Sequence, residues 1–250
     1  MAPPPPSLAP APPRRSPAER AWTPFGLAYH MVLRCAFLIA LLLATAGTWR
    51  WPEAWAVALA QEAFWFPVGL YLLRHDPGLI AERARALMGA PPGVAAFDRV
   101  LVPLFIATTA AGYAAAGLQR RLAPPPAPLA PATALTAAAA LAAALAGVSW
   151  ALLSNRWFSG VVRLQPERGH AVCSAGPYAF VRHPAYAAWL LQAPAECVLL
   201  QSSWAGALGA ARCATLVVRA ALEDRWLHQN LPGYREYAAR VRYRLVPWLW

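Results

Sequence analysis

Residues 186–222 read YAAWLLQAPAECVLLQSSWAGALGAARCATLVVRAAL, an apolar stretch interrupted by one short polar run. A helix needs about 20 residues to cross a bilayer, so this stretch is too long for one span and suits two. The polar run, Gln201-Ser202-Ser203, lies near its middle. The stretch therefore predicts a helical hairpin with a tight turn at these three residues.

Four further apolar blocks precede the hairpin, at 31–48, 54–73, 100–119 and 132–153. The chain is 59% hydrophobic and only 13% charged, with a mean hydropathy of +0.38. Soluble domains carry about 25% charged residues, so an ordinary soluble enzyme, a disordered protein and a secreted disulfide scaffold are excluded. The predicted fold is an all-α, polytopic transmembrane bundle of five to six spans.

We divide the chain into three parts. Residues 1–20 are Pro-rich and lack the apolar stretch of a signal peptide, so we expect a disordered cytosolic tail. Residues 21–153 carry the first four spans. Residues 154–250 carry the polar motifs, the hairpin and a final polar segment.

The basic residues indicate the orientation of the spans. All 22 are arginines, and 18 of them fall on the side that holds the tail, the polar segments 74–99 and 154–185, and the chain after the hairpin. Arginine-rich loops stay in the cytoplasm, so we expect a multi-pass protein of a bacterial inner membrane with both termini and the site cytoplasmic. Because the arginines serve this purpose, the net charge of +11 does not point to nucleic acid.

The four cysteines show no C-x-x-C spacing, and no metal site is predicted.

Two polar clusters adjoin the membrane, where polar groups are costly unless they are used or paired. One runs from Gln165 to His170 and continues through 176–186, GPYAFVRHPAY. The other holds Arg219 and Glu223-Asp224 and continues to about Pro247. If they face each other, they enclose a polar pocket at the membrane surface.

Arg182 and His183 precede Pro184, which suits the first position of a helix. They would then lie at a helix N-terminus, where free amides favour an anion such as a ligand carboxylate, and Tyr186 would reach the same pocket. The alternative is an arginine that anchors the helix at lipid headgroups, with His183 as its cap. Arg219 and Glu223 are four residues apart on one helix face, so a structural ion pair between them is also open.

The combination of Gly-Pro-Tyr at 176–178, Val-Arg-His-Pro-Ala-Tyr at 181–186 and Arg219-x-x-x-Glu223-Asp224 resembles the isoprenylcysteine carboxyl methyltransferase family. This family is grouped with the phospholipid N-methyltransferases among membrane-embedded methyltransferases. The resemblance covers about 154–250, and 75–99 is similar in looser form. Three departures are a shorter spacing between Gln165 and His170, Ala188 in place of a glycine, and Asp224 in place of a second glutamate. An alanine there would tighten the pocket by one methyl group.

The resemblance implies S-adenosyl-L-methionine as cofactor and an amphiphilic acceptor, with a carboxylate as the methylated group. Arg219 would hold the acceptor, and Glu223 would act with it at the reaction centre and bind the cofactor. The remaining cofactor contacts would come from Gln165, His170, Ala171, Val172, Cys173, Tyr178, Arg182, His183, Pro184, Ala185 and Tyr186. The partners would be membrane lipids and a lipid-like or isoprenoid acceptor that enters from the bilayer.

Methyl transfer from a sulfonium to a carboxylate combines a cation and an anion into neutral products, which a water-poor membrane face favours. A carboxylate is ionised at neutral pH, so alignment is required and a general base is not. An amine acceptor would need a base, for which Glu223 or His183 are the candidates.

Three alternatives remain open: a phospholipid or amine N-methyltransferase, a sterol-type reductase that uses NADPH, and a non-enzymatic membrane protein such as a small transporter. Against the last, the clear mid-span acidic residues are few, namely Glu62 and Glu196, and the paired broken helices of transporters are missing.

Overall fold

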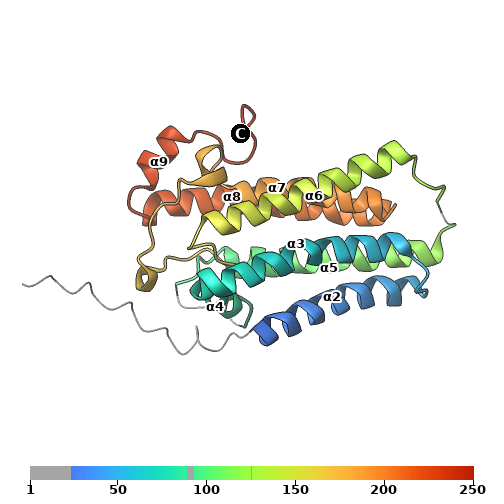
Figure 1. The fold of residues 1–250 in the computed structure, drawn as a ribbon. Coiled ribbons are helices and arrows are strands. Elements are labelled where there is room, and N and C mark those ends of the chain that lie inside the picture. Colours follow the sequence, from blue (N-terminus) through green and yellow to red (C-terminus); the bar gives the residue numbers. More distant parts are fainter. Residues whose placement is uncertain (1–23, 89–92, 125) are drawn as a thin grey trace, which may run out of the picture.

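The computed structural model describes residues 24–88, 93–124 and 126–250, and these fold into helices and loops with no β-strand among them. The long helices lie side by side (Figure 1): α2 (Pro24–Ala46), α3 (Pro52–His75), α5 (Asp98–Leu122), α6 (Pro131–Ser154), α7 (Pro184–Leu199) and α8 (Ser203–Asn230). The predicted all-α bundle is therefore confirmed. The predicted tail, residues 1–20, lies outside the described residues.

Within the described part of the chain, five helices are long and apolar enough to cross a membrane: α2, α3, α5, α6 and α8. Helix α7 has 16 residues. At a rise of 1.5 Å per residue it extends about 24 Å, short of the ~30 Å hydrocarbon layer. This result agrees with the predicted five to six spans.

The predicted hairpin turn is confirmed at 200–202. Helix α7 ends at Leu199 with Leu200 as its C-cap, and Gln201 takes a positive φ of 52°. Ser202 caps α8 by accepting a hydrogen bond from the amide of Ala205 at 3.1 Å. Proline starts helices α3, α6 and α7, in agreement with its preference for the first helical position.

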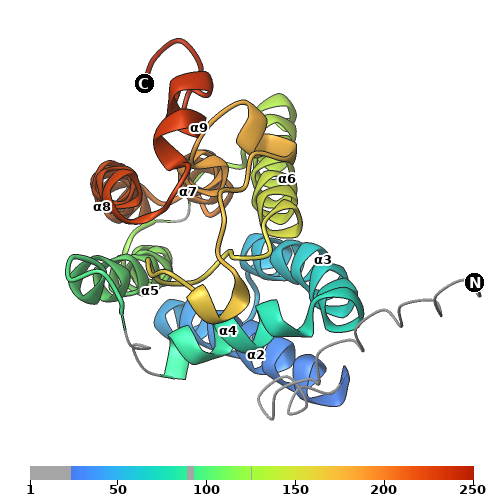
Figure 2. The same cartoon turned by 90° about the vertical axis from the view of Figure 1, so that its left-hand side faces the viewer.

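Four short elements gather at one end of the bundle: α4 (Pro77–Met88), η1 (Pro166–Arg168), η2 (Gly176–Ala179) and α9 (Tyr234–Arg240). Figure 2 views this end, where the loop between α6 and α7 crosses the helix ends. Helix α4 was expected only as part of a polar segment. Its Leu79 and Ile80 are buried against Val68, Leu72 and Leu152, which explains why this segment is helical.

Helices α2 and α5 approach closely at Gly117. A Cβ atom at this position would lie 2.6 Å from the carbonyl oxygen of Leu42 and would overlap the Thr45 hydroxyl. A larger residue at 117 would therefore force the two backbones apart. The absence of a side chain lets α2 pack against α5.

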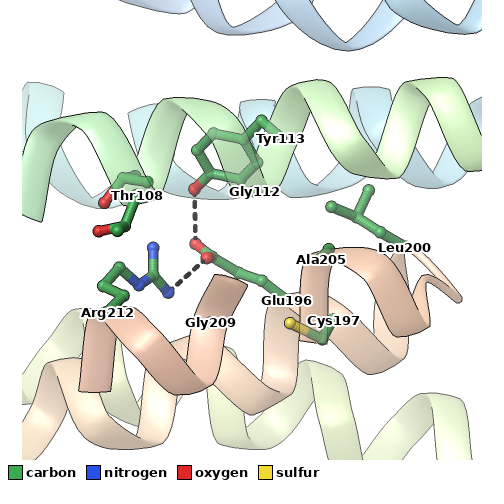
Figure 3. A pocket seen from close by; sticks show the side chains of 10 residues that line it. Thr108, Gly112, Tyr113, Glu196, Cys197, Leu200, Ala205, Gly209 and Arg212 are labelled. Carbon is green, nitrogen blue, oxygen red and sulfur yellow. Dashed lines mark hydrogen bonds and ion pairs between the residues drawn. The ribbon is translucent and has the colours of Figure 1, made fainter. Parts of the chain in front are cut away.

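The mid-span acidic residues both have arginine partners. Glu62 accepts from Arg34 at 2.6 Å. Glu196 accepts from Arg212 and from Tyr113, each at 2.9 Å (Figure 3). It also accepts from Gln192 at 2.6 Å. The Glu196 cluster thus joins α5, α7 and α8 inside the bundle. A cavity of about 20 Å³ beside it is too small for an organic ligand.

Arg212 is one of the four arginines that the sequence places on the side of the membrane opposite the other 18, and the structure corrects this. It lies within α8, is buried and is neutralised by Glu196. The arginines left at that end are Arg50, Arg120 and Arg121, so the difference between the two ends becomes larger. The cytoplasmic position of the α4 and α9 end remains a prediction.

We expect Arg212→Met to lower the melting temperature in detergent strongly, because it leaves the Glu196 carboxylate buried without a cation. Breaking such a pair costs about 3–5 kcal/mol. Tyr113→Phe removes one hydrogen bond to the same carboxylate and should cost about 1 kcal/mol. Equal melting temperatures for the two variants would show that the Arg212–Glu196 pair does not stabilise the bundle.

Candidate active site

A cavity of about 280 Å³ lies at the bundle end that carries α4 and α9. It is bounded by α4, α5, the loop between α6 and α7, α7, α8 and α9. The predicted site residues that line it are His170, Ala171, Val172, Cys173, Tyr178, Arg182, His183, Pro184, Ala185, Tyr186, Arg219 and Glu223. The structure therefore brings the two predicted clusters together at one cavity.

Gln165 is the predicted site residue that does not line the cavity. Its side chain is fully buried, donates to the carbonyl of Trp157 at 2.8 Å and accepts from Arg168 at 2.7 Å. These bonds hold the loop that forms the cavity wall. In this structure Gln165 supports the wall.

The cavity follows one face of α8. Arg219, Glu223, Leu227 and Leu231 are spaced four residues apart and all line it. At 1.5 Å per residue, the distance from Arg219 to Leu231 is roughly 18 Å. The cavity is therefore elongated, and it extends along α8 from Arg219 and Glu223 to the aromatic residues of α9.

The α5 side of the cavity is apolar. Val102, Phe105 and Ile106 line it from one face of α5, and Trp189 of α7 contacts Phe105 with ring centroids 5.5 Å apart. Arg219 pairs with Asp98 at the start of α5, so these three residues lie deeper along the bundle than Arg219. The cavity thus has an apolar inner end and a polar outer end.

Arg219 pairs with Asp98 and not with Glu223, which corrects the ion pair weighed from the sequence. Its Nε and Nη2 atoms donate to the two carboxylate oxygens of Asp98, each at 2.8 Å, and Nη2 also donates to the Gly160 carbonyl. Asp98 further accepts from the amide of Val162. These hydrogen bonds fix the position of the Arg219 side chain. They use its Nε and Nη2 atoms, and its Nη1 atom takes no part in them.

Glu223 is the cavity carboxylate without a cation among the described residues. It is partly buried, and it accepts a hydrogen bond from the hydroxyl of Tyr186. Tyr186 is held between other groups, because its ring stacks on His183 and lies 5.2 Å from the guanidinium carbon of Arg219. The site therefore presents a fixed, unneutralised carboxylate to the cavity.

Asp224, next to Glu223, has a different role. It is 1% exposed and accepts two hydrogen bonds from Arg182, at 2.7 and 3.0 Å, one from Arg244 at 2.8 Å and one from Tyr234 at 3.0 Å. It therefore ties the 182–183 segment to α8, α9 and the C-terminal segment. His183 Nε2 lies 3.6 Å from the same carboxylate.

The anion site predicted at the start of α7 has fewer unused hydrogen-bond donors than expected. The amides of Arg182 and His183 donate to the carbonyls of Tyr243 and Arg244, each at 2.9 Å, and the amide of Tyr186 donates to His183. The Arg182 side chain is occupied by Asp224 and by the carbonyls of Val241 and Arg242. The C-terminal segment therefore takes up donors that had been expected to meet a ligand.

Helix α4 is joined to the cavity wall by a buried ion pair. Arg163 donates to both oxygens of Glu82, at 2.8 and 2.6 Å, and Ser159 donates to the same carboxylate at 3.0 Å. The hydrogen bond to Glu82, supported by a second one to Glu167, raises the pKa of Arg163 despite its burial. The loop over 155–165 is thus held against α4.

His170 is a neutral donor at the cavity. Burial, together with the nearby Arg163 and Arg168, lowers the pKa of His170 to about 4. Its Nδ1 accepts from the amide of Gln165 at 3.3 Å, so the neutral ring carries its proton on Nε2. Burial also raises the pKa of the Cys173 thiol, so this cysteine is not a thiolate nucleophile at neutral pH.

The lowered pKa of His170 predicts a loss of stability in acid. An unfolded histidine titrates near pH 6.5, so between about pH 6.5 and 4 the unfolded chain binds a proton that the folded chain does not. Stability should therefore fall as the pH falls through this window. His170→Gln should show a smaller fall in melting temperature between pH 7 and 4.5, with the exposed His75→Gln as control. Parallel curves for wild type and His170→Gln would contradict this prediction.

Three groups of the site were not predicted from the sequence as such: Asp98, the Glu82–Arg163 pair and Arg83. Asp98 stands directly before an apolar span, so it lies at the same membrane depth as Arg219. This shared depth was the feature of the sequence that could have indicated an Asp98–Arg219 contact. The Glu82–Arg163 pair depends on how the 155–165 loop folds, for which the sequence holds no comparable signal.

The departure at Ala188 has a structural explanation. Ala188 does not line the cavity, so the expected tightening of the pocket by its methyl group is wrong. Its Cβ atom faces α6, where a Cβ added to Gly147 would lie 3.1 Å away. The small residue on each helix allows α6 and α7 to pack closely.

The fold and the cavity define a polytopic helical membrane protein with a polar site at one end of the bundle. Residues 135–229 match the sequence model of the isoprenylcysteine carboxyl methyltransferase (ICMT) family. This segment contains most of the cavity motifs, so the match supports the predicted resemblance to that family. The match, together with the apolar helices, points to a membrane methyltransferase. A search of curated proteins gave no match.

Proposed function

We propose that the chain transfers a methyl group from S-adenosyl-L-methionine to the carboxylate of an amphiphilic acceptor. The observation that carries the proposal is the Glu223 carboxylate, which no cation of the described residues neutralises, beside acidic residues that are already paired with arginines. A cationic ligand is the natural partner of such a group.

The cavity residues suit this cofactor in the chemistry of their donors. Glu223 would attract its positive charge, and the neutral His170 would donate a hydrogen bond from Nε2. Aromatic side chains could contact the adenine ring of the cofactor through their faces and edges. They are Tyr178, Tyr234, Tyr237 and Trp157, which stacks on His170 with ring centroids 5.6 Å apart. When bound, S-adenosyl-L-methionine supplies an electrophilic methyl group on a sulfonium.

The acceptor would use the inner end of the cavity. Its apolar tail would lie against Val102, Phe105, Ile106 and Trp189, and Nη1 of Arg219 would orient its polar group. The two ligands would then meet near the level of Arg219 and Glu223, which are one helical turn apart. Holding two reactants in this way can lower the barrier by several kcal/mol.

The reaction joins a carboxylate oxygen to the methyl carbon and breaks the carbon–sulfur bond, giving an ester and a neutral thioether. No proton is moved, so the site needs no general base. Tyr186 has the task of keeping Glu223 in place, and Asp98 has the same task for Arg219. The cavity wall formed by 155–165 would exclude water from the reacting groups.

The test is incubation of the purified chain in nanodiscs with S-adenosyl-L-methionine labelled in the methyl group and an extract of membrane lipids. We expect a labelled lipid-soluble product that releases labelled methanol in mild base, because carboxyl methyl esters hydrolyse there. The rate should be nearly constant between pH 6 and 8, since the acceptor is ionised throughout. Base-stable label, with a rate that rises with pH, would establish the N-methyltransferase alternative instead.

A further inference from the structure

One arginine at the cavity has a charge that no carboxylate of the described residues balances. The other cavity arginines each hold an acidic partner: Arg163 with Glu82, Arg182 with Asp224 and Arg219 with Asp98. Arg83 lines the same cavity, and within the described part of the chain it forms neither a hydrogen bond nor an ion pair. Its guanidinium carbon lies 5.2 Å from the centre of the Phe158 ring.

The fold holds Arg83 at this position. Leu79 and Ile80, one helical turn earlier on α4, are buried against α3 and α6, and Glu82 is fixed by Arg163. Arg85, two residues later, has 44% of its side chain exposed and does not line the cavity. The orientation of α4 therefore directs Arg83, and not Arg85, to the cavity.

Burial and a second arginine, Arg34, act on the charge of Arg83. Burial and the charge of Arg34 lower the pKa of Arg83 to about 10, so the guanidinium stays protonated at neutral pH. Arg34 itself is paired with Glu62. A partly buried cation without a counter-ion, on a cavity wall, favours an anionic ligand.

We propose that Arg83 binds the acceptor carboxylate together with Nη1 of Arg219, and that Arg83 thereby selects acidic acceptors over neutral ones. This inference rests on the proposed function and adds to it the residue that distinguishes acidic from neutral acceptors. Glu223 and Arg83 then divide the ligands by sign, with the cofactor cation at one and the acceptor anion at the other. The ester product has lost its charge, so Arg83 binds the acceptor more tightly than the product and favours product release.

The test measures binding of farnesoate and of its neutral analogue farnesol to the full chain in micelles of a neutral detergent. We compare wild type, Arg83→Gln, Arg83→Lys and the control Arg85→Gln. Arg83→Gln should weaken farnesoate binding about tenfold or more and change farnesol binding less than about twofold. Arg83→Lys should retain part of the preference for the acid, and Arg85→Gln should match wild type.

The inference is overturned if wild type binds the acid no better than the alcohol, or if Arg83→Gln leaves the preference unchanged. Phosphatidylglycerol added at the same mole fraction separates two sources of the anion. Full displacement of farnesoate would assign Arg83 to a lipid headgroup and contradict the inference, whereas retained binding supports it. S-adenosyl-L-methionine binding, measured in parallel, should be equal in all four proteins. If wild type does not bind it, the proposed function fails, which is a separate result.

Discussion

Glu223→Gln is expected to weaken the binding of S-adenosyl-L-methionine by about 30-fold or more. The substitution keeps the size and one oxygen acceptor for the Tyr186 hydroxyl, and it removes the negative charge that faces the cavity. Loss of one partner of a desolvated charge pair costs about 2–5 kcal/mol, and the partial burial of Glu223 places the effect at the lower end. Titration calorimetry in nanodiscs measures this difference.

The matched control is Glu236→Gln, which removes the same charge from an exposed position on α9. It should bind the cofactor like wild type. Tyr186→Phe is an intermediate case, because it removes the hydrogen bond to Glu223 and keeps the ring, so we expect about a tenfold loss. If Glu223→Gln binds the cofactor as well as wild type and melts at the same temperature, Glu223 is not a cofactor residue.

Asp98→Asn is expected to destabilise the folded chain strongly, because it leaves Arg219 buried without its negative partner. Arg219 is 6% exposed and Asp98 is 1% exposed, and breaking a pair buried to this degree costs about 3–5 kcal/mol. Asparagine still offers an oxygen to the amide of Val162, so the effect reports mainly on the ion pair. Thermal melting in detergent gives the measurement.

A double-mutant cycle identifies the true partner of Arg219. The structure predicts that Asp98→Asn and Arg219→Met together cost much less than the sum of the two single changes, with a coupling of about 1–3 kcal/mol. The same cycle between Arg219→Met and Glu223→Gln should show little coupling. The reverse pattern would restore the Arg219–Glu223 ion pair and would remove Asp98 from the account.

The spans were predictable because a bilayer imposes a length and a composition on each one. The blocks at 54–73, 100–119 and 132–153 lie within helices α3, α5 and α6, and the hairpin turn falls where the polar residues interrupt the apolar stretch. Helix α4 was not predicted, since its charged residues conceal a short apolar face. Leu79 and Ile80 gain their burial from α3 and α6, which the local sequence does not reveal.

The composition of the cavity was predictable from the motifs, and the pairing within it was not. Arg219 and Asp98 are separated by 121 residues and Arg163 and Glu82 by 81. Their contacts depend on how far each helix is shifted along its neighbour, and the sequence does not specify this shift. The same dependence explains why Arg182 meets Asp224 and Arg83 meets no carboxylate among the described residues.

The central claim is that the cavity binds S-adenosyl-L-methionine, and titration of the full chain with this cofactor in nanodiscs tests it most directly. We predict binding of S-adenosyl-L-methionine and of its demethylated product with Kd values below about 1 mM, and no binding of NADPH. If neither of the first two compounds binds and NADPH does, the account is contradicted, and the cavity belongs to a membrane reductase.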